Sequence, residues 1–293
     1  MKHQTILITG ASGLIGTALS EQLKSAGHTV KKLSRSGDGL TWDLEKGTIS
    51  AGALEDVDTV VHLAGAPIAQ RWTAKAKKDI LESRVQGTRL LAEAILKEPN
   101  PPAFISASGA NYYGFNQGEL LDESAPSGDG FLAEVCRAWE EAAGALIDHG
   151  VRTAFMRTSI VLSSKGGALA KMITPFKMGV GGRIGSGDQK MSWISLPDLV
   201  NLYQFVIENE SIHGPVNAAA PKPVSNTVFT RELGTALGRP TFIPLPEAVV
   251  KTLFGEMGEE TVLADLGLIP AKATAHGFQW TTPDLASALL KVL

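Results

Sequence analysis

The sequence predicts an α/β protein with a Rossmann-type, doubly wound parallel sheet and a smaller C-terminal α-rich lobe. In the first 165 residues, short β-branched runs alternate with longer helical patterns, which is typical of βαβ units in a parallel sheet buried on both faces. Beyond residue 165 the pattern changes to glycine-rich and proline-rich segments. We therefore expect a Rossmann domain over 1–165, to which part of 185–215 returns, and a substrate lobe and cap over 166–293.

Each element follows from its local pattern. Short apolar runs predict the strands, at 4–9, 28–33, 40–43, 58–63, 103–107 and 152–158. Helical periodicity between these runs predicts the helices, near 14–26, 73–97 and 131–148. After a polar-to-apolar segment at 189–196, we expect a helix near 197–209 and an α-rich cap over 210–293, where prolines separate short helical runs.

Composition excludes several classes of partner. The chain has 27 Lys and Arg against 30 Asp and Glu, and no run of like charge offers a nucleic-acid site, so a small-molecule substrate is expected. No apolar stretch reaches the roughly 18 residues of a membrane span. Cys136 is the single cysteine, so no intrachain disulfide can form and a cytoplasmic location is expected. The histidines lack metal-ligand spacing, and nothing specifies an oligomeric state.

A glycine-rich turn stands between the first predicted strand and the first helix. It reads Gly10-Ala11-Ser12-Gly13-Leu14-Ile15-Gly16, and its glycines permit a tight turn, close approach to a pyrophosphate and helix-to-strand packing. The helix N-terminus supplies free amides and partial positive charge for phosphates. The turn therefore predicts a dinucleotide-binding site, the alternative being a purely structural turn.

The end of the second strand indicates which dinucleotide is bound. NAD-preferring folds place an acid about 20 residues past the glycines to bind the ribose hydroxyls. Here the chain has Ser34 and Arg35 instead. A guanidinium fork and a hydroxyl suit an adenosine 2′-phosphate, so NADP(H) is expected, the alternative being a solvated arginine in a loop.

Two further strand ends carry candidate residues. A small Ala64-Gly65 pair follows the strand at 58–63, where backbone can approach a cofactor, although an ordinary turn is the alternative. His62 lies inside that apolar strand and is interpreted as a core histidine rather than a catalytic base.

Several motifs in order resemble the extended short-chain dehydrogenase/reductase superfamily of nucleotide-sugar epimerases and dehydratases. They are GASGLIG, VVHLAG, RVQGTRLLAEA at 84–94 and ISASGANYYG at 105–114. Within that superfamily, FLAEVCRAWEEAA at 131–143, GGRIGSGDQKMSWISLPDL at 181–199 and the proline-rich tail look like the 39U subgroup of epimerase family proteins. Members of that subgroup carry an added C-terminal domain of unknown function, here 240–293.

The resemblance implies a set of cofactor contacts. Gly10, Gly13 and Gly16, with Ser12, Leu14 and Ile15 of the same turn, would hold the pyrophosphate. Ser34 and Arg35 would hold the 2′-phosphate. The remaining implied contacts are Asp43 and Leu44 at the adenine, Leu63, Ala64 and Gly65 at the adjoining ribose, and Val161 at the nicotinamide. Arg84 stands where the superfamily often has Asn and is assigned to a cofactor phosphate, the alternative being a helix-surface arginine.

The catalytic half departs from the superfamily pattern. There, a Ser on the fifth strand and a Tyr activated by a Lys four residues later transfer protons. Ser108 matches the Ser, but no tyrosine here has a lysine four residues later. In the helix where the pair belongs, one register offers Leu132 and Cys136 and the other offers Phe131 and Val135, and neither is an acid/base pair. Tyr113 is the substitute assigned, the alternative being an aromatic wall.

Gln189 and Trp193 are assigned to the substrate side, and Trp193 either stacks on a ring or fills a core gap. Two functions follow from these observations. One is an NADP(H)-dependent oxidoreductase or sugar epimerase-like enzyme with nonstandard acid/base residues and an unidentified small-molecule substrate. The other is a regulatory or sensor protein that binds NADP(H) without catalysis.

Overall fold

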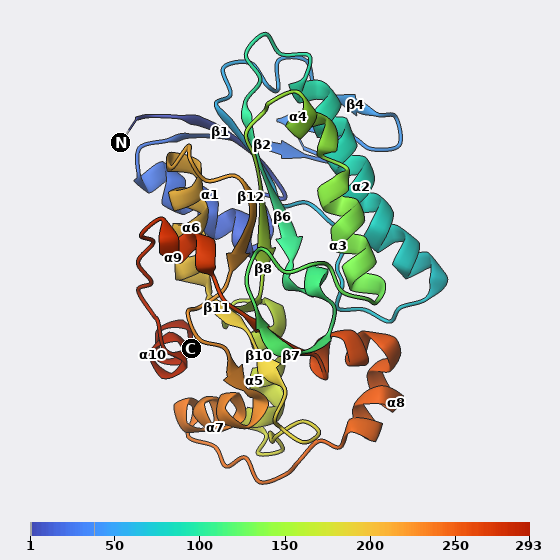
Figure 1. Cartoon of the computed structure of the whole chain (residues 1–293), viewed down its shortest axis with the longest axis vertical. Helices are drawn as coiled ribbons and strands as arrows, with labels where there is room; N and C mark the ends of the chain where they lie inside the picture. Colours follow the sequence, from blue (N-terminus) through green and yellow to red (C-terminus); the bar gives the residue numbers. More distant parts are fainter. Residues whose placement is uncertain (1, 38) are drawn as a thin grey trace.

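The computed structural model describes residues 2–37 and 39–293, and it contains a large twisted sheet with helices on both faces (Figure 1). The strand order is β12-β8-β6-β5-β1-β2-β3-β4, and every pair is parallel except β3 with β4. Its strands are β1 (Thr5–Thr9), β2 (Thr29–Ser34), β3 (Leu40–Asp43), β4 (Thr48–Ile49), β5 (Thr59–His62), β6 (Ala103–Gly109), β8 (Thr153–Thr158) and β12 (Gly214–Ala218). The predicted fold class is confirmed.

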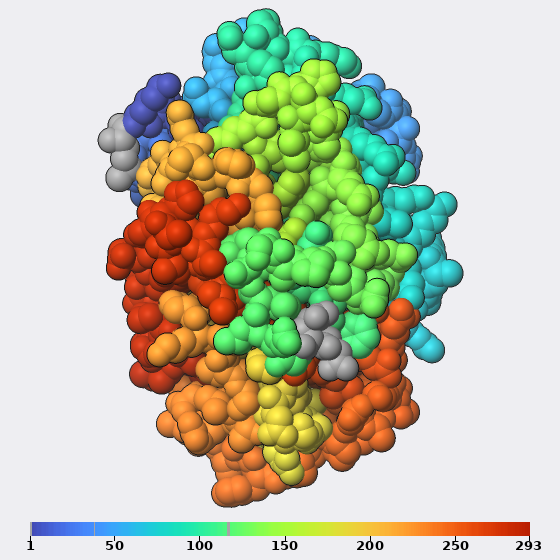
Figure 2. Space-filling model, in the orientation of Figure 1, coloured from blue at the N-terminus to red at the C-terminus, as the bar shows by residue number. Residues whose placement is uncertain are grey.

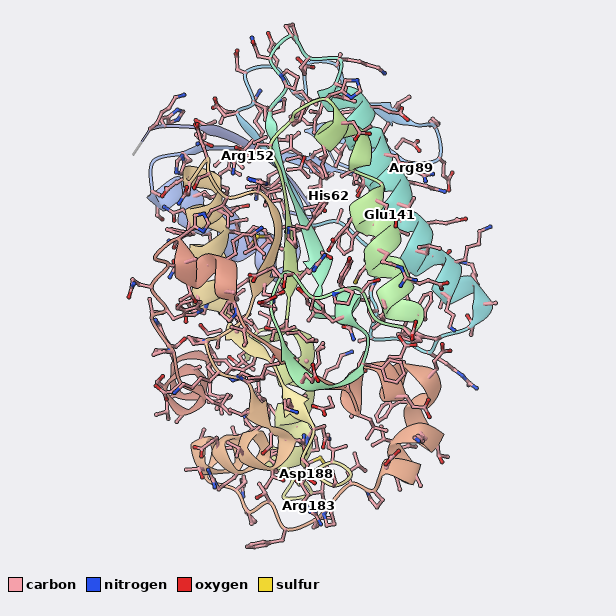
Figure 3. All side chains as sticks on the ribbon, viewed as in Figure 1. His62, Arg89, Glu141, Arg152, Arg183 and Asp188 are labelled. Carbon is pink, nitrogen blue, oxygen red and sulfur yellow. The ribbon has the colours of Figure 1, made fainter. Side chains whose placement is uncertain are left out.

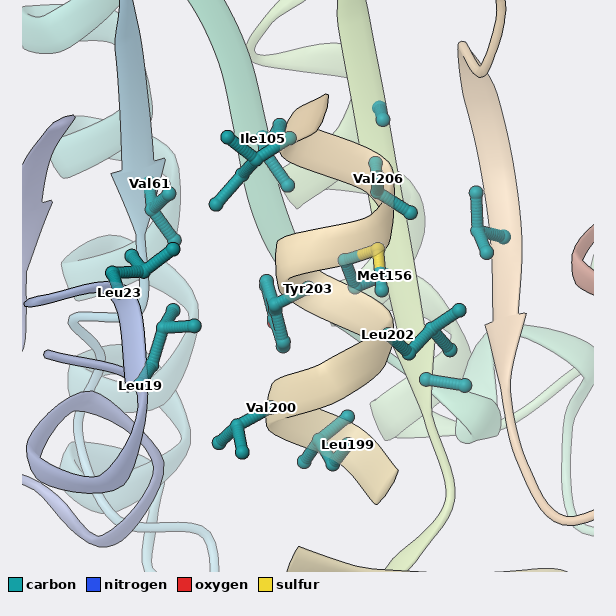
Figure 4. Close-up of a cluster of buried hydrophobic side chains, with 14 of the residues drawn as sticks. Leu19, Leu23, Val61, Ile105, Met156, Leu199, Val200, Leu202, Tyr203 and Val206 are labelled. Atoms are coloured by element: carbon teal, nitrogen blue, oxygen red, sulfur yellow. The ribbon is translucent and has the colours of Figure 1, made fainter. Parts of the chain in front are cut away.

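Two helical layers bury the faces of this sheet. Helices α1 (Leu14–Ser25) and α6 (Leu196–Glu208) cover one face, and Figure 4 shows their apolar side chains packed against β5, β6 and β8. Helices α2 (Ala74–Ile95), α3 (Phe131–Glu141) and α4 (Gly144–Asp148) cover the other face. The single helix expected over 131–148 is two helices, because residues 142 and 143 form a turn between α3 and α4.

A smaller lobe is built around a second sheet with the order β13-β10-β14-β7. These strands are β7 (Asn116–Leu121), β10 (Lys190–Met191), β13 (Val224–Ser225) and β14 (Asp265–Leu268). A separate pair joins β9 (Ile160–Leu162) to β11 (Trp193–Ser195). The helices of this half are α5 (Gly167–Lys177), α7 (Asn226–Leu237), α8 (Glu247–Met257) and α10 (Leu285–Val292). The short helix α9 (Ala271–Ala275) packs on the large sheet instead, where Ala273 belongs to the core.

The tail over 210–293 is rich in helices, as expected, but it is not a separate cap. It contributes β12 to the edge of the large sheet, where it pairs in parallel with β8, and β13 and β14 to the second sheet. It is also tied back to α6, because the buried Asp198 carboxylate accepts backbone hydrogen bonds from Thr281 (2.8 Å) and Thr282 (3.0 Å). The two halves of the chain are therefore interleaved.

No helix within 2–37 and 39–293 is long and apolar enough to cross a membrane. Those same ranges contain no group of three or more His, Cys, Asp or Glu side chains that could hold a metal ion.

Candidate functional site

The three glycines of the first turn differ in how much room the structure leaves for a side chain. Gly10 has a φ of +69°, and a Cβ there would lie 2.8 Å from the carbonyl carbon of Leu63. A Cβ at Gly16 would lie 2.3 Å from the Gly10 carbonyl oxygen. Gly13 has extended backbone, and its Cβ would meet only the Gly10 oxygen, at 3.3 Å. Ser12 and Gly13 are exposed. The fold requires Gly10 and Gly16, whereas Gly13 is open to a ligand.

The start of α1 has the properties of an anion-binding site. No side chain caps its first turn, so the amides there keep their hydrogen-bonding capacity and their share of the helix dipole. The chain after β9 passes close by, because a Cβ at Gly167 would lie 3.5 Å from a Leu14 methyl group. Val161 and Ile15 pack against the same core cluster. The structure therefore brings Leu14 and the segment after Val161 to one edge.

The residues assigned to the adenosine end follow β2 and β3. Arg35 is exposed and makes no ion pair with any residue that the structure describes. Ser34 Oγ donates to a backbone carbonyl two residues on, at 2.7 Å. Asp43 accepts two backbone N–H groups at 3.0 Å, one of them from Lys46, and that bond lowers the pKa of its carboxyl. Because this carboxylate shapes its own turn, Leu44 and the backbone remain as the groups that can meet an adenine.

Arg84 is a buried cation without a counter-charge. Its Nη1 donates to the carbonyls of Ala66 (3.1 Å) and Ile80 (2.9 Å), and its guanidinium lies 4.9 Å from the Trp139 ring centre. A Cβ at Gly65 would lie 3.0 Å from its Cζ, so the glycine makes room for it. Burial lowers the pKa of Arg84, and no carboxylate among the described residues pairs with it. Arg84 is therefore buried and not at the helix surface, although it does pair with the neighbouring Ile80 carbonyl.

His62 belongs to the core beside this arginine. It is fully buried, and its Nδ1 lies 2.7 Å from Thr9 Oγ1. Burial, followed by the charge of Arg84, lowers its pKa to about 3. The imidazole is therefore neutral at physiological pH, as expected of a core histidine. In Figure 3 it lies in the middle of the larger sheet unit.

A row of polar side chains crosses three adjacent strands where the acid/base site was expected. Ser108 on β6, Arg157 on β8 and Asn217 on β12 are register partners. Ser108 Oγ donates to Glu140 Oε1 at 2.7 Å. Arg157 donates two hydrogen bonds to the same carboxylate, from Nε at 2.9 Å and from Nη2 at 2.8 Å. Arg157 is buried and the Glu140 side chain is 11% exposed, so the geometry of the ion pair is fixed by the strands and by α3.

Tyr113 closes the row and does not resemble a proton donor facing a substrate. It is 0% exposed, donates to Asn217 Oδ1 at 2.8 Å and accepts from Arg157 Nη1 at 2.9 Å. Burial raises its pKa to about 12, which the nearby Arg157 only partly offsets. A ring that is fully buried and bonded to Asn217 and Arg157 does not face a substrate, as the catalytic assignment requires, and it does not line an open pocket, as the alternative of an aromatic wall requires. Leu132 and Cys136 are buried too, and burial raises the thiol pKa to about 11.

The two residues assigned to the substrate have structural partners instead. Trp193 is 1% exposed and belongs to the apolar core of the lobe, which contradicts a stacking role. Gln189 Nε2 donates to the Ile184 carbonyl at 3.0 Å and so holds the glycine-rich turn. Arg183 and Asp188 of that turn lie at the far pole of the lobe, away from His62 (Figure 3).

The buried pair Arg157–Glu140 was not assigned from the sequence. Arg157 interrupts the apolar run TAFMRT of a strand that the pattern places in the sheet interior. A charged residue in such a run signals a buried partner, because an unpaired buried charge is strongly unfavourable. No local pattern indicates which carboxylate that partner is.

A shallow cavity of about 500 Å³ lies at the opposite end of the sheet. It is lined by Asp58, His149, Arg152 and Glu210, with Lys2 and six neighbouring residues. Asp58 precedes β5 and Arg152 precedes β8, so this cavity faces the amino ends of the strands. Ligands of doubly wound sheets bind at the carboxyl ends, so we do not assign the cavity to the site.

Two family models match the chain. The model of the NAD dependent epimerase/dehydratase family matches residues 6–219, and that of a domain of unknown function (DUF1731) matches residues 245–292. Epimerase family protein Mb2239 of Mycobacterium bovis is 40% identical over 99% of this chain and 97% of its own length. Human epimerase family protein SDR39U1 is 38% identical, over 98% of this chain and 99% of its own.

Solved structures agree with this placement. A crystal structure of human SDR39U1 (isoform2) with NADPH has a TM-score of 0.90 at 37% identity, covering 98% of both chains. A nucleoside-diphosphate sugar epimerase from Corynebacterium glutamicum has a TM-score of 0.84 at 34% identity, covering 100% of this chain and 58% of that one.

Proposed function

The chain belongs to the NAD-dependent epimerase/dehydratase family, and from that premise we propose that it binds NADP(H) along the carboxyl edge of its large sheet. We further propose that it is an oxidoreductase or sugar epimerase-like enzyme with nonstandard acid/base residues. Its substrate would be a small molecule. The bound nicotinamide would supply hydride transfer, and this chain's residues would bind and orient it.

The observation that carries this proposal is the exposed Gly13 turn at the uncapped start of α1. An unpartnered helix N-terminus beside an exposed glycine offers amides that a pyrophosphate can reach closely. Arg84 adds a second feature, because a cofactor phosphate would supply the counter-charge that this buried guanidinium lacks. The human relative at 37% identity was crystallised with NADPH.

The proposed cofactor contacts follow β1, β2, β3 and β5 or reach their carboxyl ends from α2 and β9. They are Gly10, Ser12, Gly13, Leu14, Ile15, Gly16, Ser34, Arg35, Asp43, Leu44, Leu63, Ala64, Gly65, Arg84 and Val161. Of these, Arg35 would distinguish NADP(H) from NAD(H), because only the former carries the adenosine 2′-phosphate.

Calorimetric titration with NADPH and NADH tests the cofactor preference. One charge-assisted contact contributes about 1.5–3 kcal/mol, so NADPH should bind roughly tenfold or more tightly than NADH. Arg35→Ala should largely remove that difference. Lys32→Ala is the matched control, since it removes an exposed positive charge from β2, the strand that Arg35 follows. Equal dissociation constants in wild-type protein would refute the assignment.

A specific observation favours the second candidate, a non-catalytic NADP(H) sensor. The Ser108 hydroxyl hydrogen is committed to Glu140, and Tyr113 is fully buried. We discriminate the two functions by NADPH oxidation and NADP reduction over a panel of carbonyls, alcohols and nucleotide sugars. Turnover that is lost in Ser108→Ala supports the enzyme, whereas tight NADPH binding with no turnover anywhere supports the sensor.

A further inference from the structure

A group of buried polar atoms lies where α2 and α3 pack on β5. In the described part of the chain, six buried side-chain nitrogen or oxygen atoms have no hydrogen-bond partner, and four of them belong to this interface. They are His62 Nε2, Arg84 Nε, Thr88 Oγ1 and Trp139 Nε1. Native proteins contain few such atoms, because a buried polar group without a hydrogen bond is unfavourable. A cluster of four therefore indicates a ligand.

These four side chains lie close together. The Arg84 guanidinium carbon is 4.9 Å from the centre of the Trp139 ring, and the His62 ring centre is 6.3 Å from that of Trp139. Arg84 and Thr88 are one turn apart on α2, with Gly87 between them. A Cβ at Gly87 would lie 3.4 Å from His62 Cε1, the carbon bonded to Nε2. The Nε2 side of the imidazole therefore faces the helix turn that carries Arg84 and Thr88.

The interface is closed to solvent, so a ligand there must be small. Each of the four side chains is at most 6% exposed. Figure 2 shows the surfaces of α2, in cyan, and α3, in light green, meeting at the side of the molecule. A nucleotide is far too large for such a place, whereas a single ion or a water molecule is not.

The atoms without partners are mainly hydrogen-bond donors. Arg84 Nε and Trp139 Nε1 carry hydrogen and cannot accept. His62 Nδ1 lies 2.7 Å from Thr9 Oγ1, an oxygen that already accepts from two backbone N–H groups. Because the described residues give the Thr9 hydroxyl hydrogen no other acceptor, it points to Nδ1, and the hydrogen of the neutral imidazole is assigned to Nε2. The group thus presents three N–H donors and the Thr88 hydroxyl.

Charge decides between a water molecule and an anion. A water molecule accepts only two hydrogen bonds and must place two hydrogens of its own, whereas Thr88 Oγ1 is the one acceptor in the group. The Arg84 guanidinium pairs with no carboxylate among the described residues. The neighbouring Cys136 thiol is not ionised, because burial raises its pKa to about 11. A buried charge of this kind is unfavourable unless an opposite charge is close.

We propose that a small monovalent anion of the size of chloride binds between β5, α2 and α3, held by Arg84, His62 and Trp139. It accepts the three N–H donors and balances the charge of the buried guanidinium. Arg84 Nη1 stays bonded to two backbone carbonyls, and Nη2 lies against Gly65, on the side of the proposed cofactor. The inference goes beyond the proposed function, because the anion would bind in the cofactor-free protein and its test needs no cofactor.

Thermal unfolding of the cofactor-free protein tests the site in solution. A ligand that binds only the folded state raises the melting temperature by mass action. Sodium chloride tenfold above its dissociation constant should raise it by about 3 °C relative to sodium gluconate at the same ionic strength, because gluconate is too large for the interface. Equal melting temperatures in the two salts at every concentration would overturn the proposal.

Two tryptophan variants separate the site from general salt effects. Trp139→Phe keeps an aromatic ring but removes one donor, so chloride affinity should fall by about tenfold or more. Trp193→Phe is the matched control, because Trp193 Nε1 is also buried without a partner but lies in the core of the lobe. That variant should keep the wild-type response to chloride. Equal responses in the two variants would contradict the proposed site.

Crystals grown in sodium bromide locate the ion directly. Bromide replaces chloride, and its anomalous scattering should give a peak between Arg84, His62 and Trp139. An ordered water molecule at that position, with no anomalous signal, would show that water alone satisfies the donors. A peak without any effect of chloride on unfolding would identify an adventitious ion only, and either result refutes the proposal.

Discussion

The glycine turn follows β1 of the large sheet, and the polar row crosses β6, β8 and β12 of the same sheet. The polar groups of the turn are free to bind a ligand, whereas those of the row are bonded within the protein. At the turn, Gly13 is exposed, α1 has no side-chain cap, and Arg35 has no ionic partner among the described residues. In the row, Ser108 and Arg157 are both bonded to the Glu140 carboxylate. The turn therefore keeps hydrogen-bonding groups for a ligand, whereas the polar groups of the row already bond to one another.

Because of this difference, the contributions of the turn and of the row can be measured separately. A turn with unpaired donors gains free energy when a phosphate arrives, whereas a satisfied buried network gains little from a new partner and loses much if a member is removed. We therefore expect substitutions at the turn to change cofactor affinity, and substitutions in the row to change stability.

The largest expected effect is at Gly13. Gly13→Val should leave the protein folded, because the backbone there is extended and a Cβ would meet only the Gly10 carbonyl oxygen, at 3.3 Å, but the side chain should abolish NADPH binding by displacing the pyrophosphate. Calorimetry gives the affinity, and thermal unfolding reports the fold. Gly16→Val is the contrasting variant, since its Cβ would lie 2.3 Å from a carbonyl oxygen and should destabilise the protein itself. A folded Gly13→Val protein that binds NADPH with wild-type affinity would show that the turn does not contact the cofactor.

The next effect is on stability in the polar row. Arg157→Met leaves Glu140 as a buried charge without its bidentate partner, and we expect the free energy of unfolding to fall by about 3–5 kcal/mol. Urea denaturation measures it. Among molecules that remain folded, the NADPH dissociation constant should stay within about twofold of wild type. A large loss of affinity with unchanged stability would place the row in the cofactor site.

A smaller, pH-dependent effect is expected at His62, which lies between the two regions. The unfolded chain has the ordinary pKa of 6.5, whereas burial and Arg84 lower the folded value to about 3. The unfolded chain therefore takes up the proton first. Stability from this group is complete above pH about 6.5 and falls by up to about 1.4 kcal/mol per pH unit towards pH about 3. His62→Asn should flatten that slope in urea titrations, and an unchanged slope would contradict a neutral core histidine.

The smallest effect is expected for cofactor affinity in Ser108→Ala. The Glu140 carboxylate keeps both bonds from Arg157, so the NADPH dissociation constant should change by less than about twofold. Calorimetry measures the NADPH dissociation constants of Ser108→Ala and Gly13→Val under the same conditions. A tenfold loss would show that Ser108 contacts the bound cofactor.

Local patterns predicted the large sheet well. The β-branched runs and helical periodicity located β1, β2, β3, β5, β6 and β8 within about two residues, because those signals arise within each segment. The second sheet was not predicted. Its strand β7 has the polar sequence NQGELL, and it pairs with β14 nearly 150 residues away. Such short strands exist only through tertiary pairing, which no local period encodes.

Predictions for the site divide in the same way. The glycine turn, Ser34 and Arg35 could be placed from spacing, because they follow successive strands of a parallel sheet. The assignments of Tyr113 and Trp193 failed because both were made from residue type, and burial depends on what the rest of the chain packs against them. Only the register of β6 with β8 puts Ser108 beside Arg157.

The position of β14 has a consequence for how the chain matures. This strand lies between β10 and β7, yet it is made only from residues 265–268. During synthesis, β7 and β10 therefore keep an unpaired edge until residues 265–268 have been made. The edge strand β12 of the large sheet is likewise added only after residues 214–218 emerge, so a nascent chain that stops before residue 265 would expose open strand edges and be prone to aggregation.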